Sequence, residues 1–393
     1  MADININETI EDKKSWFNIK RFSIGDKHFE KPEKCLDSKR LDQATYRTLK
    51  DSFKFYEASK VLRKYDNLVK LYDEDNGQFV DNFFYKRDWL SGSPNVINFT
   101  FEFNPFLYVR TIDNLNWFFN QYYPYSHLFL TVPNIRLTKT VDKKTVQIID
   151  FESYVKFVDS AFKILNDKNN KPIFVPVSMR MGIKKLTELI QHYLKEEHYY
   201  YWFDFEGQPI NERNLGRLRH VFDTIKTSEN FGNVISYFTN IKREILSNSH
   251  EQTSVASDAL AAVAGANLIG VNREPLKYNP KIGEDSTIRA PTPVDPNHKA
   301  RIFNRETYYY VKTNDANLYS PRKYVPLNAA RLNAEFTTQC EYFLENQNID
   351  TLLNGKIMFK DEKAGNVLKG LTSKSTESSK PKMPDSDLTD FLG

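Results

Sequence analysis

The sequence has only two cysteines among 393 residues, Cys35 and Cys340, which argues against a disulfide framework and a cysteine-rich zinc cluster. Its seven histidines show no His-x-His or His-Glu-x-x-His spacing, which disfavours a metal-dependent hydrolase barrel. No Gly-x-Gly-x-x-Gly or Walker-type loop follows a predicted strand, and no Gly-x-Ser-x-Gly elbow is present. We therefore expect no metal, no cofactor, and no serine or cysteine nucleophile.

The excess of positive charge is also small, because 55 basic residues face 51 acidic ones and leave a net charge of +4. That balance does not by itself indicate a nucleic-acid partner. No apolar run approaches the roughly 20 residues that span a bilayer, and the polar start Met1-Ala2-Asp3 is unlike a signal peptide. The expected setting is a reducing cytoplasm, with no membrane partner.

Aromatic residues, in contrast, are abundant, at 14% of the chain with 22 Tyr and 29 Phe. Large rings can fill a protein core, or they can form stacking surfaces for bases or sugars. The sequence leaves both interpretations open.

The pattern between Pro172 and Arg273 alternates apolar strands with amphipathic helices, which is typical of βαβ units. Its sharpest strand lies in Tyr199–Gly207, whose apolar run predicts a strand buried on both faces of a parallel sheet. About seven strands are predicted, with Tyr308–Lys312 as a candidate eighth, so we expect an α/β fold with a (β/α)8 barrel of the TIM type. The segment Asp42–Tyr72 is predicted to be helical, because its apolar residues recur at three- and four-residue spacing. The predicted strands are Phe17–Phe22, Val96–Phe103, His127–Val132, Pro172–Val177, the run from Tyr199, Val234–Phe238 and Ala266–Val271.

Composition divides the chain into four parts. Residues 1–14 are predicted to be a disordered N-terminus, residues 15–315 to form the barrel with insertions, and residues 316–372 to form a C-terminal helical extension. Residues 373–393 are predicted to be a disordered tail, because Lys, Ser and Pro dominate its first half. The tail ends in an acidic and apolar tip, Asp385–Gly393, which could dock into a groove of a protein partner or could be inert.

Polar residues collect where the predicted strands end, which is the edge of a parallel sheet where ligands bind in α/β proteins. In a barrel these strand ends converge on one mouth. We expect Glu102, Asp204 and Glu206 to be catalytic carboxylates, serving as nucleophile and general acid/base. Arg180 and Arg273 would hold a phosphate or an anionic intermediate. The expected substrate-binding residues are Asn104, Asn134, Ser178, Arg180, Asn240, Asn272 and Arg273.

Strand parity adds a constraint to this site. Asp204 and Glu206 share a parity, so both can face the barrel interior while Phe203 and Phe205 pack outward against helices. The alternative interpretation is structural, with Asp204 and Glu206 capping the following helix or pairing with the arginines.

Three segments carry a family resemblance. Ser257–Gly270 is similar to an Asp-Leu-Leu-x-Ala-Val helix that leads to Gly-Val-Asp-x-Phe-Asp, and Phe99–Phe106 to a degenerate Asp-Ser-Gly-Gly-Phe strand end with Glu102 at its acidic position. Leu327–Gly355 is similar to a closing helix pair. Together they resemble the tRNA-guanine transglycosylase (queuine/archaeosine) superfamily, including its divergent branch that acts on DNA. The resemblance implies a nucleic-acid partner and exchange of a purine for a 7-deazapurine in tRNA or DNA.

The chain departs from that family at its chemical residues. The family's nucleophilic aspartate falls on Gly270, its three-cysteine, one-histidine zinc site is missing, and its Gln-Gly-Gly turn becomes Ser178-Met179-Arg180. Either Asp204 or Glu102 is then a relocated nucleophile, or transglycosylation is lost. In the second case the barrel would bind nucleic acid without catalysis or serve as an assembly subunit. A barrel enzyme for an unrelated small molecule is a third hypothesis.

Overall fold

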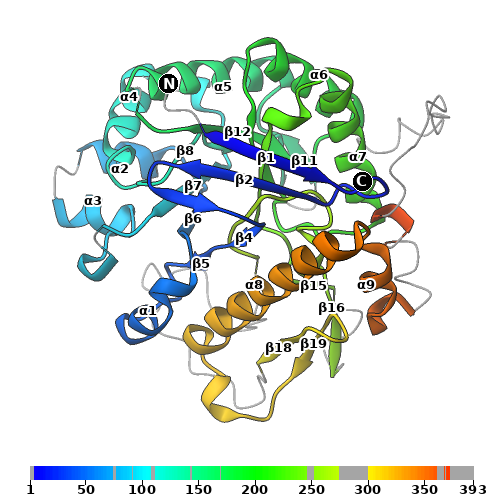
Figure 1. Cartoon of the computed structure of the whole chain (residues 1–393). Helices are drawn as coiled ribbons and strands as arrows, with labels where there is room; N and C mark the ends of the chain where they lie inside the picture. The colour runs from blue at the N-terminus through cyan, green and yellow to red at the C-terminus, as the bar shows by residue number, and fades with distance from the viewer. Residues whose placement is uncertain are drawn as a thin grey trace.

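Eight parallel strands form a closed barrel in the computed structural model (Figure 1). The structure describes residues 4–371, apart from 74–76, 91, 108–110, 142–143, 169, 246–251, 274–299, 361–366 and 368. In barrel order, the strands are β4 (Glu33–Lys34) continuing into β5 (Leu36–Asp37), β6 (Tyr56–Leu62), β7 (Asn95–Phe101), β8 (Leu130–Thr131) continuing into β9 (Asn134–Ile135), β12 (Ile173–Ser178), β13 (Tyr200–Asp204), β14 (Ile235–Thr239) and β17 (Leu268–Ile269).

Two segments close the barrel because each pairs with a different neighbour on either side. β4 pairs with β17 while β5 pairs with β6, and β8 pairs with β12 while β9 pairs with β7. All of these pairs are parallel, as are β6–β7, β12–β13, β13–β14 and β14–β17. The prediction of a (β/α)8 barrel is confirmed.

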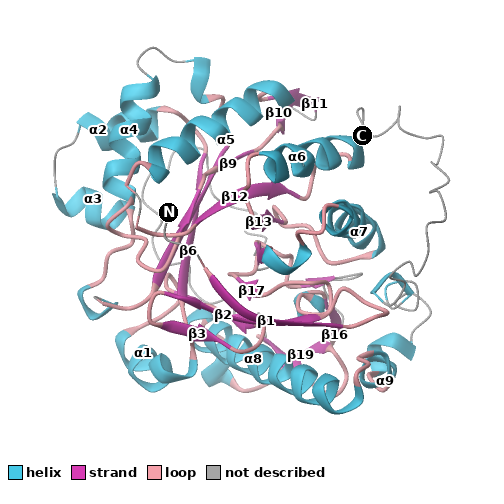
Figure 2. Cartoon of the chain, turned by 45° about the horizontal axis from the view of Figure 1, so that its top comes forward, coloured by secondary structure: helices cyan, strands magenta, loops and turns pink. Residues whose placement is uncertain are grey.

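Helices lie around the outside of the strands, as Figure 2 shows for α5, α6 and α7. None of the helices in the described part of the chain is both long and apolar enough to cross a membrane. The α-helices are α1 (Gln43–Leu49), α2 (Asp66–Asp73), α3 (Gly77–Phe83), α4 (Thr111–Tyr122), α5 (Phe151–Asn166), α6 (Ile183–Lys195), α7 (Glu212–Thr227), α8 (Pro321–Asn346) and α9 (Asp350–Asn354). Short 3-10 helices are η1 (Lys50–Ser52), η2 (Asp88–Leu90), η3 (Pro105–Leu107), η4 (Phe231–Asn233), η5 (Asp258–Leu260), η6 (Ala316–Leu318) and η7 (Ile357–Lys360).

Caps and apolar stripes explain where these helices form. Asp150 begins α5 by accepting a hydrogen bond from Ser153 N, and Asn211 begins α7 by accepting one from Asn214 N. The inward stripe of α5 recurs at three- and four-residue spacing and consists of Tyr154, Phe157, Val158, Ala161 and Leu165.

An antiparallel sheet of β1 (Asn5–Glu11), β2 (Asn18–Ile24) and β3 (Lys27–Phe29) closes the amino-terminal end of the barrel. In Figure 1, β1 and β2 lie across the front of the barrel in dark blue. Phe22 stacks on Phe29, and Phe29 contacts Phe55 just before β6. Two expectations change here. Part of residues 1–14 forms a strand rather than a disordered end, and Phe17–Phe22 lies in a strand of this sheet rather than of the barrel.

A second antiparallel sheet is built from two segments of the chain, one that follows β14 and one that follows β17, the last two barrel strands. It consists of β15 (Glu244–Ile245), β16 (Thr253–Ala256), β19 (Tyr309–Lys312) and β18 (Arg301–Asn304) in that order. The candidate eighth barrel strand, Tyr308–Lys312, is therefore wrong, because β19 pairs antiparallel with β16 and β18. A separate hairpin of β10 (Thr138–Val141) and β11 (Lys144–Gln147) follows β9.

The predicted helix over Asp42–Tyr72 is also wrong in its middle, where β6 forms. This strand carries Glu57 and Ser59 on its interior side and Lys60 on the other, so it lacks the continuous apolar run expected of a buried strand. The apolar residues that flank it recur at helical spacing by coincidence. The first barrel strand, β4 with β5, was missed for a different reason, since each half pairs over only two residues.

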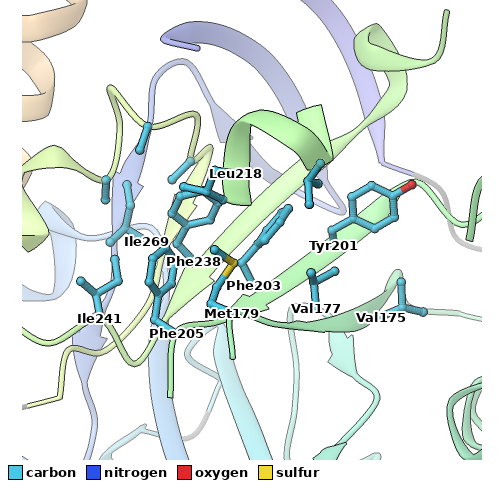
Figure 3. Close-up of a cluster of buried hydrophobic side chains, with 14 of the residues drawn as sticks. Val175, Val177, Met179, Tyr201, Phe203, Phe205, Leu218, Phe238, Ile241 and Ile269 are labelled. Carbon is cyan, nitrogen blue, oxygen red and sulfur yellow. The ribbon is translucent and has the colours of Figure 1, made fainter. Parts of the chain in front are cut away.

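The main core lies between the strands and the surrounding helices. Phe203 and Phe205 are fully buried in it, so the predicted outward packing of these two rings is confirmed. Figure 3 shows part of this layer, with Phe203 and Phe238 beside Leu218 of α7. The phenyl rings of Phe203 and Phe238 lie 5.0 Å apart in an edge-to-face arrangement.

The middle of the barrel interior is polar and centres on Glu57. Tyr237 Oη donates a 2.5 Å hydrogen bond to Glu57 Oε2, and Val271 N donates to the same oxygen at 2.8 Å. Burial raises the pKa of the Glu57 carboxyl. A Cβ at Gly270 would overlap Glu57 Oε2 and lie 2.6 Å from Thr239 Cγ2. Gly270 is therefore the position that leaves room for the Glu57 carboxyl.

We predict that Gly270→Ala destabilises the fold by about 1 to 3 kcal/mol, because the added methyl group overpacks the barrel around Glu57. Combined with Glu57→Ala, it should cost clearly less than the sum of the two single changes. Denaturant unfolding measures both effects. The matched control is Gly216→Ala on α7, where a Cβ meets nothing within 4 Å and the change should be neutral or stabilising. Equal effects at the two glycines would contradict this account.

Candidate functional site

Side chains at the carboxyl-terminal ends of four neighbouring strands form two layers above the barrel interior. Each strand contributes one residue to the lower layer and the residue two positions later to the upper layer, since strand side chains alternate between faces. The lower layer is Thr100, Asn134, Ser178 and Asp204, and the upper layer is Glu102, Arg136, Arg180 and Glu206. We call these eight residues, together with Asn240, Arg63 and Arg273, the mouth cluster.

Asp204, the last residue of β13, joins several strands through its carboxylate, which is fully buried. Oδ2 accepts hydrogen bonds from Thr100 Oγ1 and Asn134 Nδ2, both at 3.0 Å. Oδ1 accepts from Asn240 Nδ2 and from the backbone N of Glu206, both at 2.9 Å. With four donors in place, Asp204 positions its neighbours and has no lone pair directed at the open mouth.

Glu206 lies in the left-handed region of the backbone map, with φ of 49°. Its neighbour Gly207 has φ of 81°, and a Cβ there would lie 2.7 Å from Arg273 Cδ. Asn240, whose carbonyl accepts from Gly207 N at 2.9 Å, also has a positive φ of 54°. Sparsely populated backbone conformations of this kind are stabilised only by their surroundings and gather at functional sites.

The Glu206 carboxyl group is held between polar and cationic side chains. Oε1 accepts hydrogen bonds from Ser178 Oγ and from Asn134 Nδ2, the latter at 3.3 Å. Oε2 lies 3.4 Å from Arg136 Nε and 3.5 Å from Arg180 Nε. The residue is 4% exposed, so this contact set replaces water almost completely.

Burial raises the pKa of Glu206 to about 7, and the neighbouring Asp204 charge adds to the effect. The hydrogen bond from Ser178 and the charges of Arg136 and Arg180 oppose the rise without cancelling it. The protonated and ionised forms of this carboxyl therefore both exist near neutral pH.

Four arginines surround the carboxylates at the mouth. Arg136 bridges the two glutamates, since its Nη1 donates to Glu102 Oε1 while its Nε faces Glu206. Arg63 Nε lies 3.9 Å from Glu102 Oε2. The side chains of Arg63 and Arg180 are 76% and 54% exposed, whereas that of Arg136 is only 19% exposed. Burial, together with the charges of Arg136 and Arg180, lowers the pKa of Arg273, so three guanidinium groups are close enough to repel one another.

Eight of the ten residues proposed from the sequence converge here, and two do not. Asn104 accepts a hydrogen bond from Phe106 N at 3.0 Å and organises the turn into η3. Asn272 accepts from Lys34 Nζ and donates to Asp258, on the side of the barrel formed by β4 and β17. The eight that converge are Glu102, Asn134, Ser178, Arg180, Asp204, Glu206, Asn240 and Arg273.

Sequence reasoning missed Arg136, which contacts both glutamates. The parity argument that paired Asp204 with Glu206 also pairs Asn134 with Arg136, so the signal was present. The predicted strand ends at Val132, but after Pro133 pairing resumes with β7 at Asn134 and Ile135. Within the described residues there is no group of three or more His, Cys, Asp or Glu side chains that could hold a metal ion.

No protein-family model matches the sequence, and no curated protein sequence matches it. Solved barrel structures match the fold. A lyase/mutase-type protein from Burkholderia cenocepacia J2315 is 9% identical, with a TM-score of 0.37, over 61% of this chain and 76% of that chain. An endo-β-1,4-mannanase from Cellulomonas fimi is 8% identical, with a TM-score of 0.38, over 62% of this chain and 65% of that chain. A phosphoenolpyruvate phosphomutase from Streptomyces platensis subsp. rosaceus is 9% identical, with a TM-score of 0.36, over 61% of this chain and 75% of that chain.

These findings correct the family resemblance. The chain was expected to belong with tRNA-guanine transglycosylases, but the barrels it matches are lyase/mutase and mannanase types. Base exchange on tRNA or DNA is therefore a wrong prediction, and nothing in the described part of the chain supports nucleic-acid binding. The Gly270 position, where the family would carry its nucleophile, is filled by the Glu57 carboxyl. At such low identities and TM-scores, the matches do not indicate what chemistry the mouth cluster performs.

We predict a pH dependence of stability that belongs to Glu206. Because its folded pKa of about 7 exceeds the ordinary value of 4.5, the folded state binds more protons between those values. The free energy of unfolding should therefore fall as pH rises from about 4.5 to about 7, and this contribution should be lost above that range. Glu206→Gln should remove a slope of roughly 1.4 kcal/mol per pH unit, measured as the difference from wild type in denaturant unfolding.

The control for this experiment is Glu188→Gln on the exposed face of α6. It should leave the pH profile of unfolding unchanged. An identical pH profile for wild type and Glu206→Gln would show that the Glu206 carboxyl does not titrate in this range.

Proposed function

We propose that the mouth cluster is the acid–base site of a barrel enzyme that acts on a small organic anion, with Glu206 exchanging a proton with the substrate. The observation that carries this proposal is the buried Glu206 carboxyl, placed between two guanidinium groups where β13 ends. Ligands bind at this end of the strands in barrel enzymes.

The charge balance of the mouth favours an anion. Four arginines face three carboxylates, and the Asp204 carboxylate is already occupied by four donors. When Glu206 is protonated, the guanidinium groups outnumber the ionised carboxylates by two. Arg180 and Arg273 lie at the solvent-exposed rim and can present paired N–H groups to a carboxylate or phosphate.

Each side chain then has a distinct role. Glu206 moves the proton, because a carboxyl with a pKa near 7 can act as a general acid when protonated and as a general base when ionised. Ser178 and Arg136 hold its two oxygens in place. Glu102, which was expected to be catalytic, instead binds Arg136 and fixes the guanidinium beside Glu206.

Exposed apolar side chains on the segments that follow three of these strands favour an organic anion over an inorganic one. Phe106 and Leu107 of η3 follow β7, Val146 lies on the hairpin after β9, and Ile183 begins α6 after β12. Leu107 is 76% exposed and the other three are 42–44% exposed. These loops follow three neighbouring strands that supply the mouth cluster, so an apolar part of the substrate could rest on them while its anionic group meets the arginines.

Titration calorimetry with phenyl phosphate and benzoate tests this proposal. Binding at the mouth should draw up to about half a proton from solution at pH 7, because about half of the Glu206 carboxyl groups are already protonated there and an anion beside Glu206 raises its pKa further. The proton shows as a difference in binding heat between buffers of different ionisation enthalpy. Glu206→Gln should bind without proton uptake, and Arg180→Gln should bind about tenfold more weakly.

The charge-matched control is Arg47→Gln on the exposed face of α1, which should bind like wild type. Tight binding with no proton uptake would contradict the role of Glu206. Turnover is sought by proton NMR in D2O with small carboxylic acids and phosphate esters, and any activity should disappear in Glu206→Gln while binding remains. Binding without turnover of any bound compound would identify a binding protein instead of an enzyme.

A further inference from the structure

The barrel wall has a gap in its hydrogen-bond ladder between β9 and β12. Val132 N donates to the carbonyl of Phe174 on β12 at 2.9 Å, but from Asn134 onward the chain pairs with β7 instead. Carbonyls two positions apart on a strand point to the same side, so the carbonyl of Pro176 faces this gap. No strand in the described part of the chain pairs with it there.

Two tyrosine hydroxyls from the outer helices fill the gap. Tyr193 Oη of α6 donates to the Pro176 carbonyl at 2.8 Å, and Tyr154 Oη of α5 lies 3.2 Å from the same oxygen. Tyr154 Oη also lies 3.2 Å from Asn134 Oδ1, in the lower layer of the mouth cluster. Both tyrosines and Asn134 are fully buried. Tyr154 is therefore a residue of an outer helix whose hydroxyl reaches a side chain of the mouth cluster.

The direction of the hydrogen bond between Tyr154 and Asn134 follows from their other partners. Asn134 Nδ2 lies 3.0 Å from Asp204 Oδ2 and 3.3 Å from Glu206 Oε1. Ionised carboxylates only accept hydrogen bonds, so the amide nitrogen belongs on their side and Asn134 Oδ1 accepts from Tyr154. Burial raises the pKa of Tyr154 well above its usual value, so the hydroxyl keeps the proton that it donates.

Without that donor, the amide of Asn134 would be free to turn over. Its oxygen would then face the carboxyl oxygens of Asp204 and Glu206, and acceptors that face one another in a buried site are unfavourable. The turned amide would also withdraw a hydrogen bond that favours the ionised form of Glu206. The Tyr154 hydroxyl thus sets which end of the amide faces the two carboxyl groups.

We propose that Tyr154 is a positioning residue of the acid–base site, which acts through Asn134 to set how readily Glu206 gives up its proton. Its side chain does not touch a substrate, because it is buried in the barrel wall behind Asn134. The catalytic meaning of this role rests on the proposed function, in which Glu206 exchanges a proton with an anion. Asn134, which the sequence suggested as a substrate-binding residue, then has both ends of its amide occupied by protein groups.

The experiment follows the Glu206 carboxyl by carbon NMR against pH, in the full chain without substrate, and assigns its signal by comparison with Glu206→Gln. In wild type the midpoint should lie at about pH 7. Tyr154→Phe removes only the hydroxyl and should raise the midpoint by about 0.5 to 1 pH unit, which corresponds to one lost hydrogen bond. Asn134→Ala should itself raise the midpoint, and in that background Tyr154→Phe should have little further effect.

The matched control is Tyr193→Phe, which removes a buried hydroxyl from the same carbonyl but not from Asn134. Both tyrosine changes should lower the stability measured by denaturant unfolding, because each removes a buried donor. Only Tyr154→Phe should move the titration of Glu206. The charged groups that face Glu206 from the neighbouring strands and its own strand are unchanged in all of these variants, and they are Asp204, Arg136 and Arg180.

Three results would overturn the proposal. The midpoint of Glu206 could be unchanged in Tyr154→Phe, or it could move equally in Tyr193→Phe, in which case loosening of the barrel wall is the cause. The full effect of Tyr154→Phe could also persist in the Asn134→Ala background, in which case Tyr154 does not act through Asn134.

Two features of the design keep the test decisive. If Tyr154→Phe did not fold, Asn134→Ala alone still tests the link, because a midpoint equal to that of wild type contradicts it. The titration is measured without substrate. Failure to find ligand binding or turnover would therefore remove the proposed function and leave the coupling between Tyr154 and Glu206 as measured.

Discussion

The Asp204 carboxylate is the interaction on which the carboxyl-terminal end of the barrel depends. It receives side-chain donors from Thr100 on β7, Asn134 on β9 and Asn240 after β14, so one buried group links four strands. The same carboxylate accepts from Glu206 N, which helps to hold Glu206 in its left-handed conformation. A buried carboxylate would be strongly destabilising without these partners. The position of Glu206 therefore follows from how Asp204 is satisfied.

The polarity of the barrel interior is graded along its axis, and this gradient explains why Glu206 is poised near neutrality. At the amino-terminal end, Phe22 and Phe29 cover an interior layer of aromatic rings that includes Phe129 and Phe174. The middle layer holds the hydrogen-bonded groups around Tyr237, among them Asn98 and Glu57. Apolar side chains fill the amino-terminal end, and at the mouth neighbouring side chains leave Glu206 only 4% exposed. The effect of desolvation on the pKa of Glu206 then exceeds the opposing effect of the Arg136 and Arg180 charges.

The packing of the barrel also explains why aromatic residues are so abundant in this chain. The rings are mostly buried in described parts of the chain, either inside the barrel or between strands and helices. Only Tyr72 and Phe106 appear among the exposed large apolar side chains. The core-filling interpretation therefore accounts for the aromatic residues in the described part of the chain, where few large rings are left exposed for stacking on bases or sugars.

The parts of the fold that the sequence predicted are those with long uniform signals. The run that ends in Asp204 and Glu206 is apolar on both faces, so both its strand and the carboxylates at its end could be found. The strand formed by β4 and β5 could not be predicted, because each half pairs over only two residues and so short a segment shows no hydrophobic periodicity. The strand β6 was not predicted because Glu57 interrupts its apolar pattern. The barrel interior accommodates this polar residue only because Gly270, over two hundred positions away in the sequence, leaves room for its carboxyl. The tail from residue 373, with its tip Asp385–Gly393, lies outside the described residues, so its role stays a prediction.

The mouth cluster shows why strand ends can predict which side chains meet but not the role of each one. Strand ends identify which side chains meet, because parallel strands deliver them to one edge. Roles depend on distances and burial that no periodicity encodes. Asp204, Glu206 and Glu102 look alike in the sequence, yet one is saturated by donors, one is poised between ionisation states, and one is bound to Arg136. The three carboxylates differ because each has a different number of donors and a different access to water, and only the folded barrel sets those two quantities.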